Sequence, residues 1–149
     1  MRILPAAMSI LVARWPLRLG PTLVPSIPNA LSGIVADVLV DTDIFVDHLR
    51  GAKELVAGKH RLNYSVITRA ELFAGSAATD VVTQLLAPFR EHPVNRAVAE
   101  RAGRIKRETG IRMPDALIAA TALEYKLSLM TRNRRDFGTV RGLRLRQLG

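Results

Sequence analysis

Oxygen-bearing side chains recur at the points where one predicted element of this sequence gives way to the next. The candidate residues are Asp41, Glu71, Asp115, Asn133 and Asp136. Carboxylate and amide oxygens are the ligands that Mg²⁺ and Mn²⁺ prefer, whereas zinc sites favour cysteine and closely spaced histidine. The chain has no cysteine, and its three histidines lie far apart. If the fold brings these oxygens together, the chemistry they offer is metal-assisted hydrolysis.

Three apolar runs predict the strands that must position these residues. The runs are 38–40, 62–67 and 127–130, and each is followed by polar residues or by helical spacing. Short continuous apolar runs are typical of strands buried on both faces, as in parallel sheets. Because ligands bind beyond the carboxyl ends of parallel strands, the candidate residues are expected to share one edge of the sheet.

The segments between the strands predict helices. Residues 81–89 and 94–108 have helical spacing, and Gly110 ends the second of these helices. Pro114 and Asp115 open a further helix that is rich in alanine and therefore buried. Residues 143–146 alternate and suggest an edge strand. The order of elements predicts an α/β domain with a mainly parallel sheet.

Two of the acids also have purely structural interpretations. Asp115 lies in the first turn of its helix, where the helix dipole favours a carboxylate. Thr68 and Glu71 have the spacing of a capping box, in which each side chain binds a backbone N–H at the helix start. Both interpretations stay open from the sequence alone.

The net charge of +9 favours a polyanionic partner such as nucleic acid. His48, His60 and His92 are predicted to be surface or loop residues. The absence of cysteine fits a reducing compartment, and we expect a cytoplasmic protein. A basic protein with an acidic, metal-holding pocket is expected to hydrolyse nucleic-acid phosphodiesters.

Residues 1–36 differ from the rest of the chain. They hold five prolines and three arginines as their only charged residues, and they match a signal peptide only loosely. Their apolar stretches are too short to span a membrane. We expect this segment to be a poorly ordered or dispensable extension, with one domain over 37–149.

Four motifs resemble those of PIN-domain ribonucleases, and more narrowly those of the VapC toxins of type II toxin–antitoxin systems. The motifs are residues 38–43, 68–72, 115–122 and 129–137. The resemblance implies a PIN-like three-layer α/β/α fold and a Mg²⁺-dependent endoribonuclease, with Mn²⁺ as an alternative metal. It also implies a homodimer held inactive by a VapB-like antitoxin, with RNA as substrate and no membrane attachment.

The same resemblance assigns roles to particular residues. Asp41 and Asp115 match the principal metal-binding acids of the family, and Glu71 matches the second acid of the site. Many PIN domains have aspartate where this chain has Asn133, so either Asn133 or Asp136 completes the catalytic set.

The residues beside these acids are expected to contact water or substrate. Asp43 departs from the family, which more often has a small hydroxyl or amide residue there that holds water or substrate. Asp43, Thr131 and Arg132 are candidates for contact with substrate.

Two other functions compete with this prediction. Asp41-Thr42-Asp43 resembles the opening motif of haloacid dehalogenase phosphatases, in which Asp41 would be a nucleophile. Phe45 is not the small residue that family has at this position, and a late pair of acids is missing. The second competitor is a catalytically impaired module that binds RNA or antitoxin, since Asn133 replaces an acid.

Overall fold

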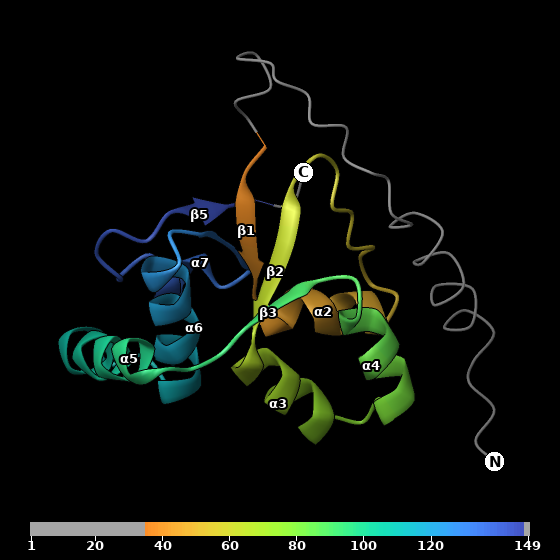
Figure 1. Cartoon of the computed structure of the whole chain (residues 1–149), viewed down its shortest axis with the longest axis horizontal. Coiled ribbons are helices and arrows are strands. Elements are labelled where there is room, and N and C mark those ends of the chain that lie inside the picture. The colour runs from red at the N-terminus through yellow and green to blue at the C-terminus, as the bar shows by residue number, and fades with distance from the viewer. Residues whose placement is uncertain (1–34, 148–149) are drawn as a thin grey trace.

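The computed structural model describes residues 35–147, and the sheet that they form is entirely parallel. Its strands lie in the order β3-β2-β1-β4-β5, with β1 and β2 crossing the centre of the molecule (Figure 1). The strands are β1 (Asp37–Val40), β2 (Arg61–Ser65), β3 (Arg90–His92), β4 (Ser128–Met130) and β5 (Leu145–Arg146). A wholly parallel sheet directs the carboxyl ends of all its strands to one edge, as the sequence predicted.

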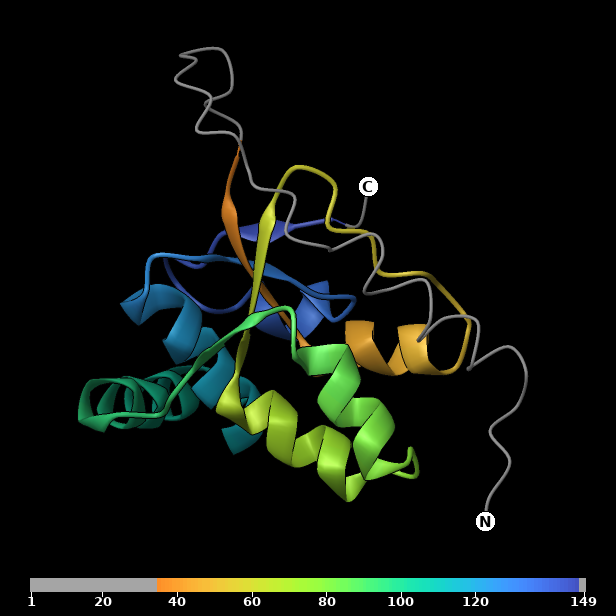
Figure 2. The same cartoon turned by 45° about the vertical axis from the view of Figure 1, so that its right-hand side comes forward.

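Helices cover both faces of this sheet. They are α2 (Thr42–Leu49), α3 (Val66–Ala74), α4 (Thr79–Leu86), α5 (Arg96–Thr109), α6 (Met113–Glu124) and α7 (Arg134–Phe137). Figures 1 and 2 show α2 and α4 on one side of β1 and β2, and α5 and α6 on the other. The three-layer α/β/α prediction is therefore confirmed.

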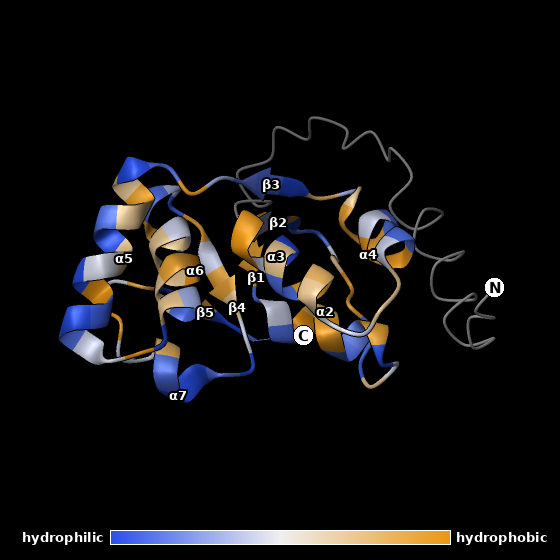
Figure 3. Cartoon of the chain, turned by 90° about the horizontal axis from the view of Figure 1, so that it is seen from below, coloured by the Kyte–Doolittle hydropathy of each residue, from blue (hydrophilic) through white to orange (hydrophobic). Residues whose placement is uncertain are grey.

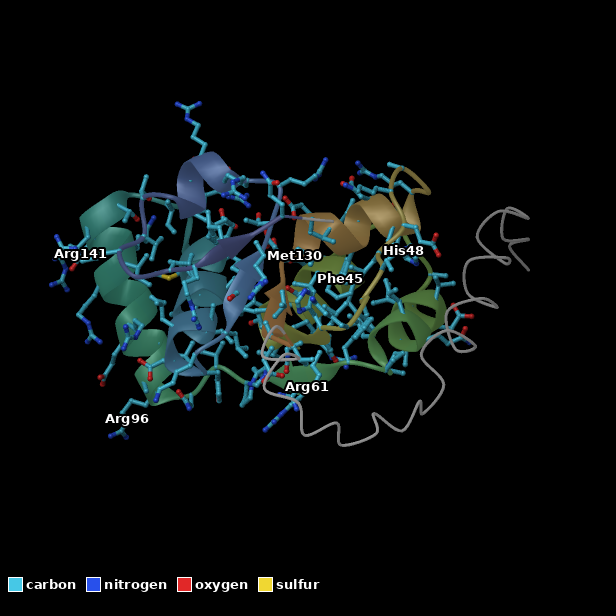
Figure 4. The ribbon with its side chains drawn as sticks, turned by 90° about the horizontal axis from the view of Figure 1, so that it is seen from above. Phe45, His48, Arg61, Arg96, Met130 and Arg141 are labelled. Carbon is cyan, nitrogen blue, oxygen red and sulfur yellow. The ribbon has the colours of Figure 1, made fainter. Side chains whose placement is uncertain are left out.

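Strand β1 joins the two halves of the core because its side chains alternate between the two faces. Val38 and Val40 pack with α2 and α4, whereas Leu39 packs with α5 and α6. On the α2 side, Phe45 and Met130 lie inside the molecule (Figure 4), and Phe45 meets the ring of Tyr64 edge-on. Burying β1 on both faces fixes its carboxyl end, where Asp41 follows.

Helix α6 is buried along most of its length. Its apolar residues surround the whole helix, and it packs closely against α5 (Figure 3). Pro114 stands in the first turn, as predicted. Because the helix is enclosed by the core, Asp115 projects from a fixed position.

The structure corrects several predicted boundaries. Strand β2 ends at Ser65, whose hydroxyl accepts the N–H of Ile67 and caps α3. The predicted capping box of Thr68 and Glu71 is therefore wrong, because α3 begins at Val66, two residues before Thr68. Strand β3 and the four-residue helix α7 lack the length that a periodic pattern needs, and the sequence did not reveal them.

Two of the three histidines are buried, contrary to the prediction. His48 accepts the N–H of Leu55 through Nδ1, and His92 lies 2.9 Å from the side-chain oxygen of Asn63. The ring of His92 also packs against that of Tyr125 at a tilt of 45°. Burial lowers the pKa of both imidazoles. The hydrogen bonds that make burial tolerable are not visible in the sequence.

Gly110 ends α5 in the left-handed conformation, with φ of 76°. We expect Gly110→Ala to lower the free energy of unfolding by about 1–2 kcal/mol, since an L-residue is strained there. Gly103 lies within α5 with open space around it. Gly103→Ala is the matched control, and it should raise stability by about 0.5–1 kcal/mol. Chemical denaturation measures the free energy of unfolding of both variants. If both substitutions raised it, or both lowered it, the left-handed role of Gly110 would be contradicted.

The predicted extension lies outside the described residues, apart from Val35 and Ala36. Within residues 35–147, no helix combines the length and apolar character that a membrane span requires.

Candidate functional site

Asp41 is held at the carboxyl end of β1 by two hydrogen bonds. The backbone N–H of Thr42 donates to Oδ1 at 2.8 Å, so Asp41 caps α2. The hydroxyl of Thr131, at the end of the neighbouring strand β4, donates to Oδ2 at 2.8 Å. The side chain is thus fixed by residues from both strands, and Asp41 is only 5% exposed.

The environment of Asp41 disfavours its negative charge. The pKa of the carboxyl is raised to about 7, chiefly by burial and also by the carboxylates of Asp43 and Asp115. The hydrogen bonds from Thr131 and Thr42 oppose this shift. The carboxylates of Asp43 and Asp115 thus act electrostatically on Asp41, and the three acids form one centre of negative charge that a cation would stabilise.

Glu71 is tied to the same place through a hydroxyl relay. Thr42, the residue after Asp41, donates its hydroxyl to Oε1 of Glu71 at 2.8 Å. Thr42 Oγ1 also lies 3.0 Å from Thr68 Oγ1. Because the single hydroxyl hydrogen of Thr42 points to Glu71, Thr68 must be the donor in this second contact. The relay ties Glu71 to the residue that follows Asp41, by tertiary contacts and not by a capping box.

Asp43 and Asp47 from α2 share one arginine. The backbone N–H of Arg132 donates to Asp43 Oδ2 at 3.2 Å. The Arg132 Nε lies 2.9 Å from Asp47 Oδ2 and 3.7 Å from Asp43 Oδ2. Burial raises the pKa of Asp43, and the charge of Arg132 opposes that shift. The other oxygen of Asp43 is buried without a hydrogen-bond partner among the described residues.

Asp115 enters from the start of α6 on another side of the centre. The residue is 8% exposed, and the exposed Arg112 donates to its carboxylate at 3.3 Å. Both interpretations of Asp115 hold at once: it lies in the first turn of α6, and it contributes to the charge around Asp41.

Asn133 and Asp136 bind each other at the start of α7. The Asn133 side chain accepts the N–H of Asp136 and donates to its carboxylate at 2.9 Å. The backbone N–H of Asn133 donates to Thr131 Oγ1, which connects the pair to Asp41. Within the described residues, Asp136 forms no ion pair with an arginine. Neither residue contacts the other acids directly, so a catalytic role for this pair stays a prediction.

The donor set fits a hard divalent ion bound largely through water. In the part of the chain that the structure describes, no three acidic, histidine or cysteine side chains converge into a ready-made ligand cage. Mg²⁺ does not need one, since it keeps several waters and binds through one or two carboxylates and substrate phosphates. The uncompensated charge of Asp41 and the unpartnered oxygen of Asp43 both favour a cation here.

Three residues of this site escaped the sequence analysis as functional candidates. Thr42 and Thr68 carry no local signal, because each acquires its role from a partner on another element. Asp47 is a charged residue of α2, yet it is buried. Its spacing of four from Asp43 puts both acids on one face of α2, which is the signal that was overlooked.

Comparisons with known proteins agree with this geometry. The PIN domain model matches residues 38–143. Ribonuclease VapC10 of Mycobacterium tuberculosis is 38% identical over 109 residues, covering 64% of this chain and 82% of that protein. A toxin–antitoxin complex from Klebsiella pneumoniae contains a chain 32% identical, with a TM-score of 0.63 over 71% of this chain and 94% of that one.

A more distant structure supports the fold alone. In the DNA-bound VapBC complex of Salmonella typhimurium, a chain that is 21% identical superposes with a TM-score of 0.66, covering 76% of this chain and 98% of that chain. The family model, the relative and the shared fold lead to the same assignment. The chain belongs to the PIN-domain family and, within it, to the VapC ribonucleases.

Proposed function

We propose that this chain is the toxin of a type II toxin–antitoxin system and a metal-dependent endoribonuclease that uses Mg²⁺. The observation that carries the proposal is the acidic centre at the carboxyl edge of the sheet, in which Asp41 and Asp115 are buried and Asp43 is partly buried. A buried centre of this kind is stabilised by a divalent cation, and Mg²⁺ fits its oxygen-only donors. We propose that it acts on RNA in the cytoplasm.

Asp41 and Asp115 would hold the ion, with Glu71 as the second acid of the site. When bound, Mg²⁺ lowers the pKa of a coordinated water and polarises a phosphoryl oxygen. Thr131 keeps the Asp41 carboxylate in one orientation, and Thr42 does the same for Glu71. The protein thereby fixes two carboxylates in advance, so little reorganisation accompanies the reaction.

The distribution of charge supports RNA as the substrate. From Arg90 to Gln147 the described chain has fourteen basic and six acidic residues, whereas residues 35–89 have five basic and seven acidic ones. The basic part includes α5, α6 and α7, and Figure 3 shows α7 and the outer side of α5 as hydrophilic. Positive charge around an acidic centre suits a polyanion whose cleaved phosphate reaches the metal.

Incubation of total RNA with the purified chain tests the proposal. Discrete fragments are expected with Mg²⁺, fewer or none without added metal, and none with EDTA. Mn²⁺ is expected to substitute for Mg²⁺, since both are octahedral oxygen-binding ions. Binding of RNA without cleavage at any metal concentration would instead favour the impaired binding module.

Thr42→Val separates the hydroxyl relay from the backbone cap of Asp41. Valine has the same shape but cannot donate to Glu71, so we expect cleavage to fall roughly 10- to 100-fold, as for other supporting contacts of metal sites. Thr83→Val is the matched control, because its hydroxyl binds only a backbone carbonyl on the exposed face of α4. Initial rates with Mg²⁺ measure the effect, and a wild-type rate for Thr42→Val would exclude a role for the relay.

The antitoxin is the expected protein partner, and a homodimer is the expected form of the toxin. The Klebsiella pneumoniae relative is described as part of a toxin–antitoxin complex. We propose that the cognate antitoxin inserts a basic side chain into the acidic centre and covers the helices after Asp41 and Glu71. Co-purified antitoxin should then suppress cleavage, and a complex in which the centre stays open would contradict this arrangement.

A further inference from the structure

Arg132 pairs with two acids, Asp43 and Asp47, that lie on the same face of α2. Asp43 and Asp47 are separated by one turn of α2, and both direct an oxygen at Arg132. Two carboxylates placed four residues apart on a helix repel each other, and Asp47 is largely buried. The shared guanidinium offsets this repulsion, so the three residues act as one unit.

The unit holds one edge of the guanidinium and leaves the other free. Asp43 binds the backbone N–H of Arg132, and Asp47 lies against Nε. Within residues 35–147, the two terminal nitrogens of Arg132 donate no hydrogen bond, and the side chain is 54% exposed. A guanidinium anchored through Nε presents its terminal N–H groups in a fixed plane, which matches the oxygens of a phosphate.

Arg132 follows directly after a residue that contacts the acidic centre. Thr131, the preceding residue, donates its hydroxyl to Asp41 at the acidic centre. The two residues after β4 therefore contact both sets of acids. Thr131 binds Asp41, and Arg132 binds Asp43 and Asp47. A phosphate bound by Arg132 is consequently adjacent to the phosphate that reaches Asp41.

We infer that Arg132 is a substrate-binding residue that holds an RNA phosphate beside the cleaved one, and that Asp47 is the positioning residue that orients it. This inference rests on the proposed ribonuclease function and names how that site holds the RNA backbone. It assigns Asp47, a buried acid, a role in binding a polyanion.

The direction in which Asp47→Asn changes the affinity for RNA tests the inference. Asp47→Asn removes a negative charge, so simple electrostatics predicts tighter RNA binding. The inference predicts binding about three- to tenfold weaker, because Arg132 loses its anchor. Fluorescence anisotropy with a labelled single-stranded RNA of mixed sequence, in EDTA and low salt, measures binding by the full chain without cleavage.

A double-mutant cycle shows whether the effect acts through Arg132. Arg132→Ala is expected to weaken RNA binding about five- to tenfold. It should also reduce the slope of log affinity against log salt concentration by roughly one, the value for one lost phosphate contact. In the Arg132→Ala background, Asp47→Asn should then weaken RNA binding no further. Unchanged or tighter binding by Asp47→Asn, or equal weakening in both backgrounds, would overturn the inference.

Two further variants control for folding and for charge. Arg132→Lys leaves Asp47 a cation but removes the planar fork, so it should fold normally and still bind RNA more weakly. Asp37 pairs with the exposed Arg61 at 2.8 Å, at the opposite edge of the sheet. Asp37→Asn is the matched control, and it should leave RNA binding unchanged or slightly tighter.

Cleavage distinguishes failure of the inference from failure of the proposed function. A wild-type protein that cuts RNA with Mg²⁺, together with normal RNA binding by Asp47→Asn and Arg132→Lys, refutes only the role of the arginine unit. A wild-type protein that does not cut RNA refutes the proposed function.

Discussion

Asp115→Asn is expected to reduce Mg²⁺-dependent cleavage of RNA by on the order of a thousandfold or more, while the protein stays folded. Asparagine keeps the shape of the side chain and its place in the first turn of α6. It removes the negative charge that the ion requires, and only Asp41 would then face the ion as a principal acid. The exposed Arg112 would lose its partner, at little cost to stability.

Initial cleavage rates with Mg²⁺ measure this loss, and titration with Mn²⁺ measures the loss of metal affinity independently. Asp80 is an exposed acid in the first turn of α4, far from the centre in sequence and fold, so Asp80→Asn controls for the change in charge. Cleavage by Asp115→Asn within tenfold of the wild type would show that the ion is held elsewhere.

Asp41→Asn is expected to stabilise the metal-free protein. The folded chain raises the pKa of Asp41 from 3.8 to about 7. At a pH above 7 the wild type therefore keeps a carboxylate ionised where burial and neighbouring acids oppose the charge. Asparagine removes that cost and still accepts the N–H of Thr42, so we expect a gain of about 2–4 kcal/mol in the free energy of unfolding.

The pH dependence of this gain follows from the raised pKa. A group whose pKa is higher in the folded state favours folding at low pH and loses that contribution as the pH rises through the folded value. The advantage of Asp41→Asn should thus be complete above pH 7 and fade toward pH 4. Chemical denaturation in EDTA at several pH values measures it, and a variant less stable than the wild type at pH 8 would contradict it.

Metal should reverse the order of stability. An ion that binds only the folded wild type stabilises it in proportion to the logarithm of its concentration. We expect Mg²⁺ or Mn²⁺ to raise the stability of the wild type and to leave Asp41→Asn nearly unchanged. The acidic centre thus lowers the stability of the metal-free protein, and it is retained because the function requires bound metal.

The sequence by itself determined the fold class and the placement of the principal acids. The strand at 38–40, the helix opened by Pro114 and Asp115, and the strand at 127–130 are local patterns of apolar residues and capping signals. Because a parallel sheet aligns the carboxyl ends of its strands, those patterns were enough to bring Asp41 and Asp115 to one edge.

Only the tertiary structure decided which residues support those acids. Thr42 meets Glu71 across 29 positions, and Arg132 meets Asp43 across 89. Such contacts depend on how α2, α3 and β4 pack, and side chains separated so far leave no spacing pattern in the sequence. The same holds for Asp47, which is buried because its charge is satisfied by a residue from another element.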